Sequence, residues 1–176
     1  MTQQWKERLG TVVLEPCQAV TAGTYQQWCL TLTVGSYGID ERGTIKIAQR
    51  FACDMQPAQF DDPAAPAYCT VETDGEAKLA PRFMPKGHDR PWMRGCVVMD
   101  GYDGSLAPGD TVKVVLGERG GGSPGIRLQT FIEAGHEFRV FVDPTNASVA
   151  RAVDESPKFA IVSGEAAELM CIVPTQ

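Results

Sequence analysis

Short segments in which apolar and polar residues alternate recur along this chain, and clusters of Gly, Pro and Asp separate them. In the clearest segment, residues 25–34, the apolar residues Trp28, Leu30, Leu32 and Val34 occupy every second position. A period of two places these side chains on one face of a β-strand. The segment is therefore expected to bury one face and to leave the other more exposed.

Further segments have the same strand-like composition, and turn-forming residues bound each of them: residues 44–51, 68–73, 77–83, 92–99, 111–116, 126–132, 136–142, 158–162 and 168–173. Asp74-Gly75 has the composition of a two-residue hairpin turn between two of these segments. Helical periodicity is weak and confined to residues 145–153. The pattern predicts an all-β fold, an immunoglobulin-like antiparallel β-sandwich of about nine strands with long irregular loops.

A length of 176 residues suits a single domain with a full hydrophobic core. We expect residues 1–19 to form an N-terminal extension and residues 20–173 to form the sandwich core. Two proline-rich stretches, Asp54–Pro66 and Met84–Pro91, are expected to be irregular loops, because proline cannot donate a hydrogen bond to a sheet.

The net charge of −6 argues against nucleic acid or an anionic membrane as the main partner, because both require clustered Lys and Arg. The first residues are charged where a secretory signal would be apolar, which predicts a cytoplasmic protein. The six cysteines are expected to be free thiols in that compartment. None has Cys-x-x-Cys spacing, so neither a structural metal nor another cofactor is expected.

The glycine-rich stretch from Gly117 to Arg127 joins two strand-like segments and is the first candidate binding surface. Its successive backbone N–H groups could form an anion nest, with Arg119 and Arg127 contacting a carboxylate or phosphate. Glu118 is a candidate for proton transfer. The simpler alternative is a long hairpin connection in which the glycines supply positive φ angles.

His88 and His136 are the only histidines, so acid–base chemistry near neutral pH has two candidate positions. His88 lies in a charged, irregular loop beside Asp89, where it could be a catalytic base or a metal ligand, and it is the stronger candidate of the two. A solvated loop residue is the alternative. Neither histidine has a motif that ties it to a nucleophilic serine, so serine hydrolase chemistry is not expected.

The two proline-rich loops contribute further candidate ligand-binding residues. Asp61 and Asp62 could bind calcium through carboxylate oxygens, although solvated acids are the simpler interpretation. An apolar pocket with one cation could be lined by Tyr37, Phe60, Arg90 and Trp92. The alternative is that Trp92 begins a strand and packs in the core.

Several segments together resemble the N-terminal region of a family of large bacterial proteins: residues 34–40, 59–63, 70–73, 90–92, 106–110, 117–131 and 137–144. The downstream part of those proteins looks like a metal-dependent hydrolase of the polymerase-and-histidinol-phosphatase type. The resemblance covers most of residues 20–173 and implies an immunoglobulin-like module that precedes a catalytic part. With two histidines, this chain is not expected to hold the multi-histidine metal centre of such a hydrolase.

Two functions remain open from the sequence. The first is a non-catalytic interaction module or accessory subunit, whose partner is another copy of itself or a larger catalytic chain. Its signature would be a sizeable apolar surface without a cleft of convergent polar groups. The second is a small-molecule-binding protein or enzyme, with a site for an anionic or aromatic ligand between the two proline-rich loops and the glycine-rich loop. A carbohydrate-binding module is a third class, which the predicted cytoplasmic location disfavours.

Overall fold

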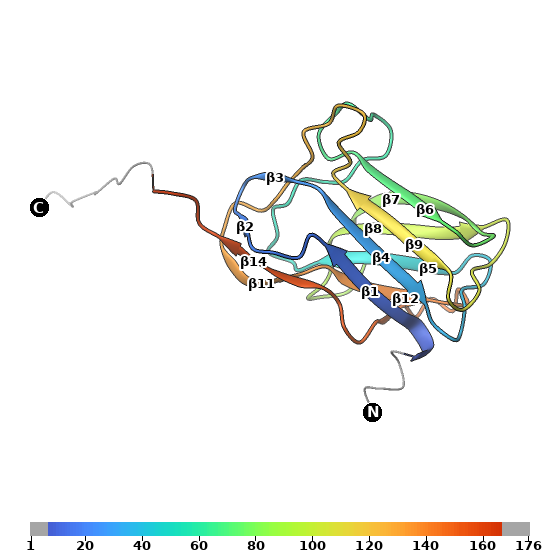
Figure 1. The fold of residues 1–176 in the computed structure, drawn as a ribbon. Coiled ribbons are helices and arrows are strands. Elements are labelled where there is room, and N and C mark those ends of the chain that lie inside the picture. Colours follow the sequence, from blue (N-terminus) through green and yellow to red (C-terminus); the bar gives the residue numbers. More distant parts are fainter. Residues whose placement is uncertain (1–6, 167–176) are drawn as a thin grey trace, which may run out of the picture.

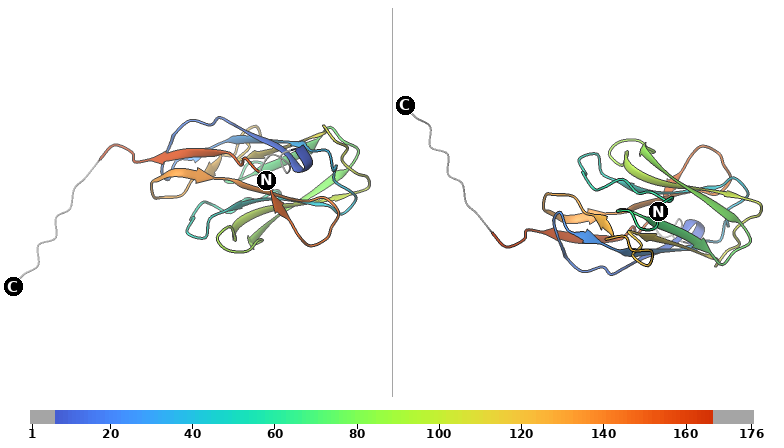
Figure 2. Two further views of the ribbon diagram at one scale, coloured as in Figure 1. Left: turned by 90° about the horizontal axis from the view of Figure 1, so that it is seen from below. Right: turned by 90° about the horizontal axis from the view of Figure 1, so that it is seen from above.

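The computed structural model describes residues 7–166, and these residues form fourteen β-strands. Two large antiparallel sheets lie face to face, with β4 and β9 in the front sheet and β5 and β8 behind them in Figure 1. The turned views show the same two layers (Figure 2). The predicted all-β sandwich is therefore confirmed, and its assignment to the immunoglobulin type stays a prediction.

The front sheet has four strands in the order β1-β4-β9-β6. Their bounds are Gly10–Glu15, Trp28–Val34, Thr111–Leu116 and Cys69–Thr73. The rear sheet has five strands in the order β13-β12-β5-β8-β7. Their bounds are Arg151–Ala152, Arg139–Asp143, Thr44–Gln49, Arg94–Tyr102 and Lys78–Lys86.

Two small sheets extend the sandwich at one end. The first pairs β3 (Tyr25–Gln26) with β10 (Ile126–Arg127). The second has the order β11-β14-β2, with bounds Glu133–Glu137, Lys158–Val162 and Val20–Thr21. In it, β14 pairs antiparallel with β11 and parallel with β2.

Alternating apolar side chains from both large sheets form the main core. Trp28 on β4 is fully buried, and its ring lies 5.6 Å from that of Phe138 and 5.2 Å from that of Phe159. Phe138 and Phe159 are themselves 5.5 Å apart, so the three rings interlock between the front sheet and the β11–β14 end. The predicted burial of Leu30, Leu32 and Val34 is confirmed.

A second apolar cluster covers part of the outer face of the rear sheet. Ala48, Cys96, Val98 and Phe141 are buried there although they point away from the main core. Loop residues cover them, among them Trp92. The expectation that Trp92 packs in the sandwich core is therefore wrong, because its partners belong to this outer cluster.

Several local expectations need correction. Asp74-Gly75 does not close a hairpin, because β6 pairs with β9 and β7 pairs with β8 in the other sheet. Instead, the Asp74 carboxylate accepts hydrogen bonds from the Thr111 amide at 2.6 Å and from its hydroxyl at 2.9 Å. These bonds hold the point where the chain crosses between sheets.

Other differences concern the bounds of elements. The predicted strand 126–132 is regular only at Ile126–Arg127, and residues 84–86 of the predicted second loop belong to β7. Residues 1–19, expected as an extension, contribute β1 to the front sheet. The weakly helical region 145–153 contains the short strand β13 instead of a helix. The predicted strand 168–173 lies outside the described residues.

Within residues 7–166, no helix has the length and apolar character needed to cross a membrane. The five cysteines in this part of the chain, which exclude Cys171, are free thiols.

Replacing Trp28 with Ala should lower the free energy of unfolding by about 3–5 kcal/mol, because the change leaves a large cavity where three rings interlock. Urea denaturation of both proteins would measure the difference. Val13→Ala is the matched control on the neighbouring strand, because Val13 is 57% exposed and its loss should change stability by less than about 0.5 kcal/mol. Equal effects of the two changes would contradict this description of the core.

Candidate functional site

The glycine-rich loop packs against the Asp54–Pro66 loop. The Ala67 amide donates to the Gly125 carbonyl at 2.8 Å, and the Gln56 amide donates to the Arg127 carbonyl at 3.0 Å. A Cβ atom on Gly121 would lie only 2.7 Å from the Pro63 carbonyl oxygen, so the close approach of the two loops requires glycine there. The structure thus brings together two of the three loops predicted to form one site.

The charged residues of the glycine-rich loop bind the protein's own backbone. Arg119 donates from Nη2 to the Tyr25 carbonyl at 2.8 Å, and Arg127 donates from Nη2 to the Asp54 carbonyl at 3.2 Å. Glu118 accepts from the Gly120 amide at 2.7 Å. These contacts favour the simpler interpretation, in which the loop is a connection that its own side chains hold closed.

The acidic residues of the neighbouring loop do not converge on one point. Asp62 accepts from the Ala64 amide at 2.9 Å, while both oxygens of Asp54 accept from Thr130. Asp61 is exposed, and Phe60 packs against the main core. Among the described residues, no group of three or more His, Cys, Asp or Glu side chains is placed to hold a metal ion.

The remaining predicted loop, Met84–Pro91, lies on the outer face of the rear sheet. There it lines a hollow that is separate from the glycine-rich loop. A hollow of about 570 Å³ separates residues 86–89 from residues 148–150, and Lys46 of β5 also lines it. A smaller hollow of about 230 Å³ shares Lys46 and Ser148 with it. We call the two together the outer-face groove.

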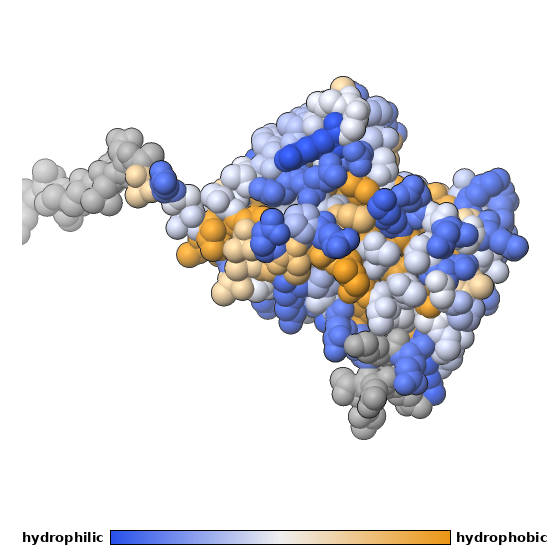
Figure 3. Space-filling view, viewed as in Figure 1, coloured by the Kyte–Doolittle hydropathy of each residue, from blue (hydrophilic) through white to orange (hydrophobic). Residues whose placement is uncertain are grey.

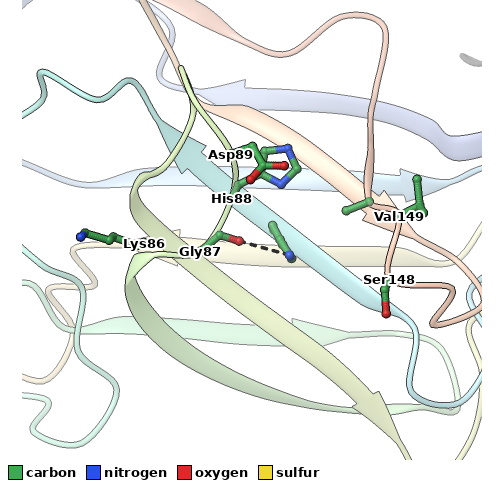
Figure 4. A pocket seen from close by; sticks show the side chains of 8 residues that line it. Lys86, Gly87, His88, Asp89, Ser148 and Val149 are labelled. Carbon is green, nitrogen blue, oxygen red and sulfur yellow. Dashed lines mark hydrogen bonds between the residues drawn. The ribbon is translucent and has the colours of Figure 1, made fainter.

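The residues of the larger hollow come from β5, from the end of β7 with the loop after it, and from the loop before β13 (Figure 4). His88 and Asp89 lie on one side, Ser148 and Val149 lie on the other, and Lys86 points away from them. Thr44, Asp100 and Asp143 line the smaller hollow. The groove is therefore a cleft with convergent polar groups.

Lys46 is the central cation of the outer-face groove. Its Nζ atom donates to the Gly87 carbonyl at 3.1 Å, the bond that is dashed in Figure 4. Its side chain is half-buried. Within residues 7–166, Lys46 makes no ion pair, whereas Arg82 nearby is paired with Asp100. A half-buried ammonium without a carboxylate partner lacks the counter-charge that buried charges normally have.

His88, the predicted catalytic base, stacks on Phe141 with ring centroids 3.8 Å apart. Burial lowers the pKa of His88 below its usual 6.5, the Lys46 charge lowers it further, and Asp89 opposes them. The ring is therefore neutral at pH 7 and presents one N–H donor. Among the described residues, no hydrogen bond joins His88 to Ser148 or Asp89, so the three do not form a catalytic triad.

The predicted Arg90 and Trp92 lie at the margin between the outer face and the end of the sandwich. The Arg90 guanidinium lies over the Phe51 ring at 4.6 Å. Arg50 and Arg139 lie over the Trp92 ring at 5.7 and 5.9 Å. Both predicted residues therefore take part in cation–π contacts within the chain.

Sequence reasoning missed a buried polar chain at the end of the sandwich. His136 is 2% exposed, and its Nδ1 atom lies 2.9 Å from Oε2 of Glu133. Gln129 donates from Nε2 to the same oxygen at 3.1 Å. Burial lowers the pKa of His136, although Glu133 raises it, so His136 is neutral at pH 7. The polar identity of residues 129, 133 and 136 was visible in the sequence, but no periodicity marked them as neighbours.

No family model matches this sequence, and no curated protein is significantly similar to it. The resemblance to the N-terminal module of larger bacterial proteins stays a prediction. The chemistry of the outer-face groove is therefore the main guide to function.

Stability should fall as the pH drops below about 6.5, because unfolded His136 takes up a proton that the folded, buried ring resists. Replacing His136 with Gln should reduce the loss of unfolding free energy between pH 7.5 and 5.5, as measured in urea. His88→Gln is the matched control and should reduce it less, because His88 is only half-buried. An unchanged pH dependence in His136→Gln would show that this ring does not resist protonation.

Proposed function

We propose that this chain is a non-catalytic binding module that holds a small, hydroxyl-rich anion in the outer-face groove. The observation that carries the proposal is the half-buried Lys46 ammonium, which lines both hollows and has no ion-pair partner among the described residues. A bound anion would supply the missing counter-charge.

The remaining groups of the groove narrow the class of ligand. Neutral His88 and Ser148 can donate hydrogen bonds near Lys46. In the smaller hollow, Asp100 and Asp143 offer carboxylate acceptors and would repel a second negative charge. The groove is thus suited to a ligand with one carboxylate and several hydroxyl groups.

Binding without chemistry agrees with the geometry of the site. Among the described residues, no hydrogen bond joins Asp89 or Ser148 to His88, so Asp89 does not orient the ring and the ring does not activate Ser148. The polar cleft favours the small-molecule alternative over a module that only contacts a partner chain. Ligand capture would then be the contribution of this module to the larger assembly that the family resemblance implies.

Titration calorimetry with gluconate, glucose and acetate tests the proposal, because these probes separate the charge from the hydroxyl groups. Gluconate should bind most tightly. Lys46→Met keeps the aliphatic stem and removes the charged donor, so it should weaken gluconate binding roughly 10- to 100-fold. Lys113→Met is the matched control on the front sheet, where Lys113 pairs with Glu72 at 3.0 Å, and it should leave binding unchanged.

Two results would refute the anion-binding function. One is wild-type protein that binds gluconate no better than glucose, because Lys46 would then contribute no charge recognition. The other is equal loss of gluconate binding in Lys46→Met and Lys113→Met, because the effect would then reflect net charge alone.

A further inference from the structure

A second hollow, of about 290 Å³, lies at the end of the sandwich where β11 begins, and we call it the end pocket. Its apolar wall includes Phe51, Phe131, Pro91 and Cys53. Phe51 and Phe131 are 51% and 41% exposed, which is high for two large aromatic rings that line one pocket. Figure 3 shows further apolar surface at this end of the molecule, over β2, β11 and β14.

Glu133 places a carboxylate in the wall of the end pocket. Its side chain is only 23% exposed, and its Oε2 atom accepts hydrogen bonds from Gln129 and His136. Both donors are neutral, because one is an amide and the other is a buried imidazole. No Lys or Arg pairs with Glu133 in the described part of the chain. Mostly buried carboxylates normally have a cationic partner, and this one has none.

Gln129 adds a fully buried polar group to the same wall. Its side chain is fully buried, and Nε2 donates to the Phe131 carbonyl at 3.1 Å as well as to Glu133. A flipped amide would turn the oxygen toward two acceptors, so this orientation is set by its neighbours. Its Oε1 atom then has no partner among the described residues. The accessible acceptor of the wall is therefore the Glu133 carboxylate, which a cationic ligand can pair with.

Nearby arginines do not fill this role. Arg50 also lines the end pocket, but its guanidinium lies over the Trp92 ring. Arg90 lies over Phe51 and makes no ion pair with Glu133. The contact of Arg90 with Phe51 shows that this ring can accept a cation on its face.

We propose that the end pocket binds a small molecule that joins a protonated amine to an aromatic or apolar body. The ammonium pairs with Glu133, whose side chain is partly exposed in the wall of the pocket. The body packs between Phe51 and Phe131, where burial of apolar area contributes most of the affinity. The net charge of −6 favours the approach of a cation.

The interaction is non-covalent. Cys53 is the thiol in the pocket wall, and burial raises its pKa to about 11, so it carries no thiolate at pH 7. Its Sγ atom donates to Gln49 at 2.9 Å, which directs it away from a role as a nucleophile. Ligand exchange should therefore be reversible and fast on the scale of a titration.

The test titrates the full chain at pH 7.5 with three probes of similar shape: 2-phenylethylamine, 2-phenylethanol and 3-phenylpropionate. Amide chemical shifts in ¹⁵N-labelled protein report where each probe binds. The amine should bind at least ten-fold more tightly than the alcohol, with shifts at residues 51–53 and 129–133. The carboxylate should bind more weakly than the alcohol, because Glu133 repels it.

Two variants separate the charge from the apolar wall. Glu133→Gln keeps the size of the side chain and removes its charge, so the affinity for the amine should fall about ten-fold, to that for the alcohol. Phe131→Ala should weaken binding of both the amine and the alcohol. Tyr102→Ala is the matched control, because Tyr102 is a similarly exposed ring, at 44%, on the far end of β8.

The comparison of probes on wild-type protein decides the proposal even if Glu133→Gln fails to fold. Equal affinity for the amine and the alcohol would overturn it, and so would shifts confined to other surfaces. Unchanged amine binding in Phe131→Ala would also overturn it. None of these results bears on the outer-face groove, which has separate residues and is tested with anions.

Discussion

The structure depends on one constraint: the two large sheets bury the apolar side chains that alternate along their strands against each other. Every second residue of β4 contributes to the layer between the sheets, and Trp28 interlocks there with Phe138 and Phe159. One face of each large sheet is therefore buried in the core and stabilises the fold. The outer face of the rear sheet is then available for other roles, and Lys46 lies on it between the buried Ile45 and Ile47. The outer-face groove therefore uses the residues of β5 that point away from the core.

The local sequence pattern predicted the bounds of several individual strands. The bounds of β9 and β14 agree with the predicted segments, because each is a short apolar run between turn-forming residues. The pairing of strands was not predictable in the same way. Asp74-Gly75 has the composition of a hairpin turn, yet the flanking strands pair with β9 and β8 in different sheets. Membership of a sheet is decided by contacts distant in sequence, and tertiary packing overrode the local signal.

The sites show the same limit at the level of single side chains. The glycine content correctly indicated a loop with positive φ angles and close backbone contacts. It could not show that Arg119 binds the Tyr25 carbonyl. His88 was found because histidines are few. Lys46 and Glu133 carry no motif, and each becomes notable only when the structure shows a partly buried charge without an opposite charge beside it. Charge pairing is a property of the folded chain, so these two groups could be recognised only from coordinates.

The position of β14 affects the order in which this protein can assemble during translation. β14 is the central strand of its sheet, between β11 and β2, and it is the last strand of the described chain. Until residues 158–162 leave the ribosome, β2 and β11 have no strand to pair with at this end. Phe159 also arrives with β14, so Trp28 lacks one of its two ring partners until then. A nascent chain stalled before this point would expose apolar side chains to chaperones, so the sandwich is expected to fold completely only after residues 158–162 have emerged.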